Sequence, residues 1–223
     1  MQSNNNVTRP TAARTVASLF GILAGIGGLT HGVGEVLQGN VRPEGVFVNS
    51  WTRGPIATNV GGEPGITIVP NMLVAGLLTI LVSLATLVWA AFFVRRKHGG
   101  RILIALSTLM LLVGGGVGPP LLGILAGAAG TQIDVPLSGW RRRLFGSARR
   151  PLVALWPLTF AVAAVSGSFL VVGSLVLVFL FGVNNAALFL NTFYLTVFSL
   201  LLTVLLAPFY DHGRAEQPLR AAD

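Results

Sequence analysis

The chain has 223 residues, of which 53% are hydrophobic and only 10% are charged. Soluble domains carry about a quarter charged residues, so a soluble fold of this length could not cover its surface. Several continuous apolar runs of the length that a bilayer requires indicate an all-α integral membrane protein, whereas a transmembrane barrel needs short alternating segments. The net charge of +8 fits basic loops that face anionic lipid better than it fits nucleic-acid binding.

Residues 1–13 are polar, and we expect a disordered cytoplasmic tail there. The first helix is expected from Ala13 to Leu37, and no small-residue cleavage site follows it, so we interpret it as a retained helix rather than a signal peptide. Small residues recur every four positions along this helix and predict a flat stripe where another helix can pack closely. They are Ala17, Gly21 and Gly25 in one row and Ala24, Gly28 and Gly32 in another.

The connection from Gln38 to Val69 is polar and longer than most simple connectors. Two β-like pieces, GVFVNSW and GITIV, predict a small β-hairpin within this external loop, residues 38–69. A second helix is expected from Pro70 to Val94, because proline suits a first helical turn and the apolar run is long enough to span a bilayer. It ends at the basic cluster RRKHGGR, residues 95–101.

The next stretch, residues 102–133, contains two apolar runs separated by GGGVGPP. The runs 102–113 and 121–133 would each form about 18 to 20 Å of helix, which is too short to cross a bilayer core of about 30 Å. Together they could cross once as a bent helix, or they could form a hairpin that returns to its own side. The tip of that hairpin would consist of Gly114, Gly115, Gly116 and Gly118, with Pro119 and Pro120 opening the return limb.

The distribution of basic residues separates these two arrangements. With a cytoplasmic N-terminus, a single crossing places six of the 15 lysines and arginines inside, whereas a re-entrant hairpin leaves only Arg42 and Arg53 outside. Because cytoplasmic loops carry the excess of basic residues, we predict the re-entrant hairpin. Irregular backbone at membrane depth is tolerated where protein buries it or where it lines a watery cavity, so the tip is a candidate site.

The C-terminal part is expected to contain two more membrane helices joined by the short turn GVNNA. We therefore predict four transmembrane helices plus the re-entrant helical hairpin in a single domain, residues 14–210, followed by a cytoplasmic tail, residues 211–223. Both termini would face the cytoplasm of a cell (inner or plasma) membrane. Five arginines before the fourth span are expected to contact anionic headgroups: Arg141, Arg142, Arg143, Arg149 and Arg150.

Ionisable residues are almost absent from the predicted spans, which argues against a proton pump, a voltage sensor or a retinal protein. The exception is THGVGE, which places His31 and Glu35 four residues apart on one helical face. Such a pair can share a proton or supply two ligands to a divalent metal, with Glu63 or nearby amides completing the set. The simpler interpretation is an interfacial pair that anchors the external loop, and we predict no metal site.

Asn184 and Asn191 form a second polar group, at the outer end of the last two helices. If their face met the first helix, these amides would line an outer polar vestibule together with His31 and Glu35. The glycine tip below it could then contact a solute through its backbone, as broken helices do in transporters. The alternative is that the asparagines join helices by hydrogen bonds and the glycines allow close packing.

Two sequence blocks, HGVGEVLQGN and LLVGGGVGPPLLGILAG, resemble the HGxGExLQGN and GGGxGPPLLG motifs of a group of small prokaryotic multi-span membrane proteins. The resemblance covers about residues 20–130. It implies a polytopic membrane protein and draws attention to His31, Glu35, residues 114–118, Pro119 and Pro120. It implies no particular activity.

These features predict the passage or binding of a small solute or ion through the outer vestibule, with His31 and Glu35 as a gate or site. The alternative function is a non-catalytic subunit or scaffold, in which the glycine stripe docks a partner helix or a second copy of the chain. No nucleophile–base pair, phosphate loop or dinucleotide motif is recognisable, so we expect neither an enzyme nor a cofactor. The expected partner is the lipid bilayer.

Overall fold

The computed structural model describes residues 11–135 and 139–220, with side chains for all of these except 60, 140–142, 144–150 and 215–220. Most of the described chain is helical. The longer helices are α1 (Ala12–Gln38), α3 (Met72–Val88), α4 (Gly99–Val113), α5 (Gly118–Gly130), α6 (Gly139–Ser168), α7 (Ser174–Phe181) and α8 (Ala186–Arg220). The short elements are α2 (Gly54–Val60), the strands β1 (Phe47–Asn49) and β2 (Pro64–Ile66), and the π-helical turns η1 (Trp89–Phe93) and η2 (Phe169–Gly173).

Among the described residues, 4 helical stretches are long and apolar enough to cross a membrane. They are Ala12–Gln38, Met72–Phe93, Pro151–Phe181 and Ala186–Arg214. Their outward faces carry large exposed apolar side chains, such as Leu81 of α3 and Phe198 of α8, which would be costly in water. The predicted all-α fold with four long apolar helices is confirmed, and it fits a multi-pass membrane protein.

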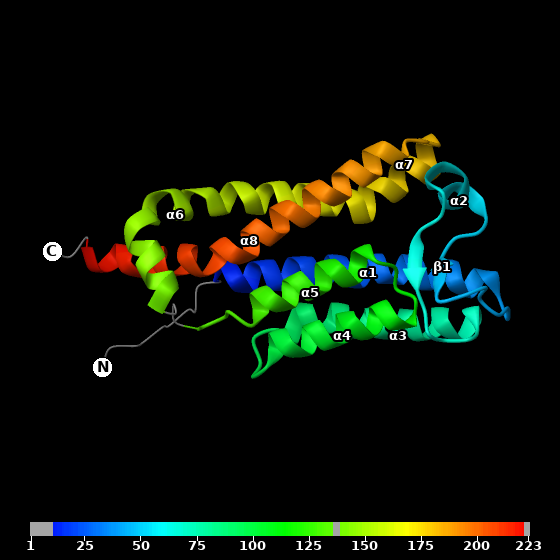
Figure 1. Ribbon diagram of the computed structural model, residues 1–223, viewed down its shortest axis with the longest axis horizontal. Helices are drawn as coiled ribbons and strands as arrows, with labels where there is room; N and C mark the ends of the chain where they lie inside the picture. Colours follow the sequence, from blue (N-terminus) through cyan, green and yellow to red (C-terminus); the bar gives the residue numbers. More distant parts are fainter. Residues whose placement is uncertain (1–10, 136–138, 221–223) are drawn as a thin grey trace, which may run out of the picture.

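The helices run along one axis and give the bundle two different ends (Figure 1). The start of α1, the end of α8 and the turns between α3 and α4 and between α5 and α6 lie at one end, which we call the basic end. The external loop with β1, α2 and β2, the α4–α5 connection and the α7–α8 turn lie at the other, which we call the loop end. The cluster 95–101 is at the basic end, whereas Arg42 and Arg53 belong to the loop end.

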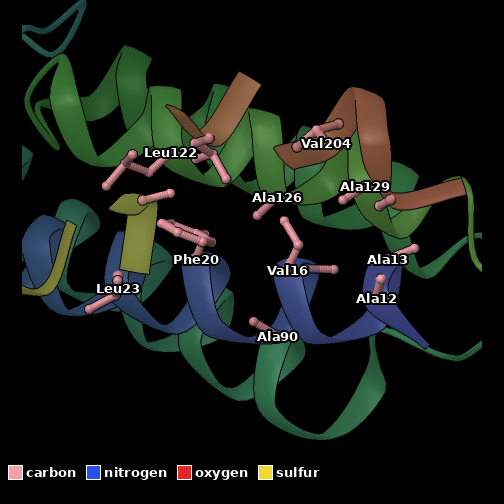
Figure 2. Packing of buried hydrophobic residues seen from close by; sticks show 14 of the residues in the cluster. Ala12, Ala13, Val16, Phe20, Leu23, Ala90, Leu122, Ala126, Ala129 and Val204 are labelled. Carbon is pink, nitrogen blue, oxygen red and sulfur yellow. The ribbon is translucent and has the colours of Figure 1, made fainter. Parts of the chain in front are cut away.

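Helix α1 lies between two groups of helices, with α3, α4 and α5 on one side and α6 and α8 on the other (Figure 1). In Figure 2, Val16 and Phe20 lie on the face of α1 that is turned toward Ala126 of α5, and Val204 of α8 lies beyond Ala126. All of these side chains are buried. The largest cluster of buried apolar residues occupies mainly the half of the bundle nearest the basic end. The loop-end half is therefore where the packing leaves room for a site.

The glycine stripe of α1 packs against α3 inside this chain. A Cβ at Gly25 would lie 2.6 Å from the Cβ of Leu87, and a Cβ at Gly32 would lie 3.0 Å from the carbonyl oxygen of Gly76. No side chain fits into such gaps, so glycine is what lets the two backbones approach. The predicted packing stripe is confirmed: its glycines contact mainly α3, whereas Ala17 and Ala24 contact Gly130 and Gly123 of α5.

Helices α4 and α5 form an antiparallel hairpin rather than one bent rod. A Cβ at Gly127 of α5 would lie 2.8 Å from the carbonyl oxygen of Gly100, and a Cβ at Gly123 would lie 2.9 Å from the Cβ of Ser107. The contacts therefore advance along α4 while they go back along α5, and Figure 1 shows the two helices side by side. Their 15 and 13 residues correspond to about 22 and 20 Å of helix. The predicted pair of half-length helices that turn at the glycines is confirmed.

The strands in the external loop also form as predicted. β1 and β2 pair antiparallel, with Phe47 opposite Ile66 and Asn49 opposite Pro64. The connection between them contains the helix α2 instead of a tight turn. The strand pair therefore closes a compact loop over the end of the bundle.

The starts of two helices differ from those predicted. α3 begins only at Met72, because the side chain of Asn71 caps it by accepting a hydrogen bond from the Val74 N–H, and Pro70 stays outside the helix. The arginine-rich segment before the third long span is helical from Gly139 onward rather than a loop, since it consists largely of good helix formers. The predicted N-terminal tail, except for residues 11–13, lies outside the described residues.

The last helix is longer than predicted. α8 continues through Pro208 to Arg220, so most of the predicted tail is helical. Its extension has a structural partner, because the Asp211 carboxylate accepts hydrogen bonds from the N–H groups of Ala12 at 2.6 Å and Ala13 at 3.2 Å. An acidic group at the start of a helix pairs with free N–H groups and with the positive end of the helix dipole. α8 therefore caps α1 at the basic end.

Candidate functional site at the hairpin tip

The hairpin tip, residues 114–117, has a backbone that requires glycine. Gly114 and Gly116 adopt φ angles of 126° and 76°, which residues with a Cβ rarely adopt. The last carbonyl groups of α4 lack partners within the helix. The Met110 carbonyl accepts from the N–H groups of Gly114 and of Gly115. The glycines thus end α4 and turn the chain at once.

The external loop covers the tip and, with α3, pairs the last two carbonyls of α4. The Ile68 N–H donates to the Leu112 carbonyl at 3.0 Å. The hydroxyl of Thr67 donates to the Val113 carbonyl at 3.2 Å, and the hydroxyl of Thr79 in α3 donates to the same oxygen at 3.1 Å. Backbone groups that a half-length helix leaves open are therefore paired with protein.

The start of α5 needs few partners because it carries two prolines. Pro119 and Pro120 have no N–H, so two of the four donors that a helix normally leaves unpaired are missing here. Pro119 also contacts α1, where a Cβ at Gly27 would lie 2.8 Å from its Cγ. The prolines thus reduce the number of unpaired polar groups at the tip and fix it against α1.

His31 of α1 is buried, and the external loop holds its imidazole from both sides. Nδ1 lies 2.9 Å from the hydroxyl oxygen of Ser50, and Nε2 lies 3.3 Å from Oε2 of Glu63. Ser50 and Glu63 face each other just beyond the strand pair, since the Ser50 N–H donates to the Glu63 carbonyl at 2.9 Å. The two strands thereby place a hydroxyl and a carboxylate at opposite edges of one ring.

Glu35 lies one helical turn after His31 and is completely buried. The Ser50 hydroxyl approaches its Oε1 at 3.5 Å, and the Thr79 hydroxyl donates to its Oε2 at 3.3 Å. Among the described side chains, no lysine or arginine forms an ion pair with Glu35. A row of polar groups consequently runs from Glu63 through the imidazole and Ser50 to Glu35 and the end of α4.

The two blocks of sequence that carry the candidate residues meet at the tip glycines. A Cβ on Gly114 would lie 2.6 Å from Cδ of Glu35, and a Cβ on Gly116 would lie 2.7 Å from Nδ1 of His31. These glycines are therefore required for their backbone angles and for contact with the two ionisable side chains. The structure therefore brings His31, Glu35 and the tip together. That these residues bind a ligand stays a prediction.

A cavity of about 520 Å³ lies beside this cluster at the loop end. It is bounded by α1, α5, the α7–α8 pair and the external loop. Its wall is mostly apolar, with Leu122, Val171 and Phe193 among the lining residues, whereas His31 and Glu63 form its main polar side. Cavities of this size with a few convergent polar groups are typical of small-molecule sites.

The tip glycines take different positions relative to the cavity. Gly118 borders it, whereas Gly115 packs against Met110 of α4. Glu35 lies behind His31 and does not line it. Of the ligand-binding residues predicted from sequence, His31 and Gly118 line the cavity, and so do Glu63 and Pro119, which the sequence also singled out.

The predicted contribution of two asparagines to the vestibule is not seen. Asn184 and Asn191 are exposed and do not line the cavity. The face of α8 that does line it is apolar and carries Ala186, Phe189 and Phe193, spaced by three and four residues. Asn191 is on another face of α8, and Asn184 belongs to the turn before the helix, so neither amide meets His31.

The arginines assigned to lipid headgroups can be only partly located. Arg143 is exposed in the first part of α6. The side chains of Arg141, Arg142, Arg149 and Arg150 lie outside the described side chains. Their contact with headgroups stays a prediction.

Ser50, His31 and Glu63 are the residue types of a hydrolase triad, but their geometry does not favour that chemistry. Ser50 is completely buried and does not border the cavity, so a substrate there could not reach its hydroxyl. No group of three or more His, Cys, Asp or Glu side chains within residues 11–135 and 139–220 is arranged to hold a metal ion. The cluster is better suited to binding a polar group by hydrogen bonds and charge.

Sequence reasoning missed several members of the site. Ser50 and Thr67 belong to the external loop, and their positions depend on how that loop folds. Thr79 offered a signal, because Thr79, Ser83 and Thr86 are spaced by four and three residues in an otherwise apolar helix and all are buried. Glu63 was considered only as a metal ligand, whereas it contacts His31 directly.

Comparison with protein-family models, curated proteins and solved structures finds no match for this chain.

Proposed function

We propose that the chain spans a cell membrane with its basic end in the cytoplasm and its loop end outside. The support is the charge distribution, because cytoplasmic segments carry the excess of lysine and arginine. Arg42 and Arg53 belong to the loop end, and the cluster 95–101 lies at the basic end. In this orientation both termini are cytoplasmic, α4 and α5 form a re-entrant hairpin, and basic side chains before the third span contact anionic headgroups.

We propose further that the protein binds a small solute in the loop-end cavity and lets it pass to or from the outside. The observation that carries this proposal is the His31–Glu63 pair, which forms the polar side of an otherwise apolar cavity of about 520 Å³. A bare ion would exchange its full hydration shell for a few polar groups on one side of such a cavity, so an organic solute fits it better.

The His31–Glu63 contact is the proposed outer gate. His31 belongs to α1, whereas Glu63 belongs to the external loop that covers the cavity. The Glu63 side chain is 27% exposed and the His31 side chain is 7% exposed, so the contact lies at the border between solvent and interior. Separation of the pair would let the loop move away from α1 and open a path to the cavity.

A scaffold function receives less support. Its structural basis was the glycine stripe of α1, and that stripe is occupied by α3 within the same chain.

The proposal is tested by thiol labelling, because the chain contains no cysteine of its own. Ser174 lines the cavity, and a single Ser174→Cys variant in membrane vesicles should react with N-ethylmaleimide. Ser83→Cys is the matched control, since Ser83 is completely buried between α3 and α1. We expect Ser174→Cys to react at least tenfold faster than Ser83→Cys. Equal and slow reaction of both would contradict an accessible cavity.

A further inference from the structure

The charge of the cavity restricts what it can hold. Among the residues that line it, only His31 and Glu63 are ionisable, and neither lysine nor arginine is present. The cavity therefore offers a carboxylate and an imidazole but no permanent positive charge. An anionic ligand would face a like charge in a poorly solvated place, where such repulsion is strong.

Glu63 also has an unused hydrogen-bonding capacity. Its Oε2 is buried, and no described group donates a hydrogen bond to it, although His31 Nε2 lies 3.3 Å away. A buried acceptor without a donor is unfavourable by about 1–3 kcal/mol. A donor that entered from the cavity would remove this cost, and a charged donor would do so best.

The rest of the wall suits an apolar body that carries an aromatic or aliphatic group. Phe189 and Phe193 of α8 line the cavity together with Leu175 and Val178 of α7. These side chains offer contact area to a hydrophobic moiety and aromatic rings to a nearby cation.

We infer that the solute of this site is a hydrophobic amine or a similar organic cation. Its charged nitrogen contacts the Glu63 carboxylate beside His31, and its apolar body lies between α5 and the α7–α8 pair. This inference rests on the proposed solute-binding function and specifies the class of solute. It assigns to Glu63 the role of counter-ion.

Three probes with one apolar body and different head groups test the inference: 4-phenylbutylamine, 4-phenylbutanol and 4-phenylbutyrate. Each is titrated against the N-ethylmaleimide reaction of Ser174→Cys. We expect the amine to protect the thiol at a concentration at least tenfold lower than the carboxylate requires, with the alcohol between them. Equal protection by the amine and the carboxylate would overturn the inference and leave the cavity itself in place. Failure of Ser174→Cys to react at all would instead contradict the proposed function.

Substitutions of Glu63 then test the counter-ion role in the same labelling assay. Glu63→Gln should remove the advantage of the amine over the alcohol, whereas Glu63→Asp, which keeps the charge, should retain most of it. Glu44→Gln is the matched control, because Glu44 is exposed in the same loop and does not line the cavity. The thermal unfolding temperature of each variant shows whether it is folded. A folded Glu63→Gln protein that still prefers the amine tenfold would overturn the assignment.

Discussion

Replacing Gly114 by alanine is the sharpest test of how the tip and α1 fit together. The φ angle of Gly114 is 126°, so a Cβ is disfavoured by the backbone alone. That Cβ would also lie 2.6 Å from Cδ of Glu35, a side chain that is completely buried and cannot move into solvent. The methyl group of alanine would therefore cause both backbone strain and a steric overlap with Glu35.

The two costs can be given magnitudes. A non-glycine residue in such a backbone region costs about 1–3 kcal/mol, and overpacking of a well-packed interior costs about 1–3 kcal/mol. The free energy of unfolding should therefore fall by about 2–6 kcal/mol in Gly114→Ala. Since folded domains are stable by only about 5–15 kcal/mol, the change is easy to detect.

The measurement is reversible unfolding in mixed detergent micelles, followed by circular dichroism. Gly39→Ala is the matched control, because Gly39 has a φ angle of 81° but no atom within 4 Å of its Cβ position. Gly39→Ala should show the cost of a positive φ without a contact, but its ψ of −161° differs from the −1° of Gly114, so the two backbone costs are not identical. The contact with Glu35, expected at about 1–3 kcal/mol, is therefore isolated by a double-mutant cycle.

A double-mutant cycle separates this contact from other effects. In a Glu35→Ala background, Gly114→Ala should cost about 1–3 kcal/mol less than in the wild type, because the group that it overlaps is gone. The reasoning is refuted if the cost of Gly114→Ala is unchanged without the Glu35 side chain.

Two further predictions concern orientation and the basic end. Gly45→Cys and Gly139→Cys are at exposed positions with open space around them, and a membrane-impermeant thiol reagent on intact cells should label only Gly45→Cys; labelling of Gly139→Cys would contradict the proposed topology. Asp211→Asn should lower the free energy of unfolding by about 0.5–2 kcal/mol, because the N-terminus of α1 loses its charged cap. Wild-type stability of Asp211→Asn would show that this cap is not needed.

The sequence predicted those features that depend on local patterns. The lengths of the apolar runs and the placement of arginine and lysine led to four long helices and a hairpin, and the α4–α5 contacts agree with the hairpin. The spacing of small residues in α1 predicted a packing face, which α3 occupies. The glycines of the tip were recognised from sequence because they stand next to two prolines, between two apolar runs that are each too short to cross a bilayer.

The parts that the sequence did not predict depend on contacts between distant segments. The partners of His31 come from positions 50 and 63, and they reach it because the β1–β2 pair sets Ser50 opposite Glu63. Whether Asn184 and Asn191 face α1 could not be predicted, because periodicity gives the relative positions of residues on a helix but not the rotation of that helix in the bundle. An apolar face of α8 lines the cavity instead.

The proposed membrane placement explains why one loop both covers the tip and positions the side chains around His31. In that placement a hairpin of half-length helices would end inside the apolar layer, where an unpaired backbone group costs several kcal/mol. Here two prolines remove donors, and the external loop supplies Thr67 and Ile68 to the last carbonyls of α4. The same loop carries Ser50 and Glu63 to the imidazole of His31.

Because the same loop covers the tip and carries Glu63, opening of the proposed gate also affects the tip. A motion that moves Glu63 away from His31 also pulls on the segment 64–68, which is hydrogen-bonded to the end of α4. Complete departure of the loop would expose the Leu112 and Val113 carbonyls, so full opening is expensive. A movement limited to Glu63 and α2 leaves the tip covered, and it breaks the contact at the cavity together with the hydrogen bond from the Ser50 N–H to the Glu63 carbonyl. The gate should therefore open by a local displacement around residues 54–63, while Thr67 and Ile68 stay bound to α4.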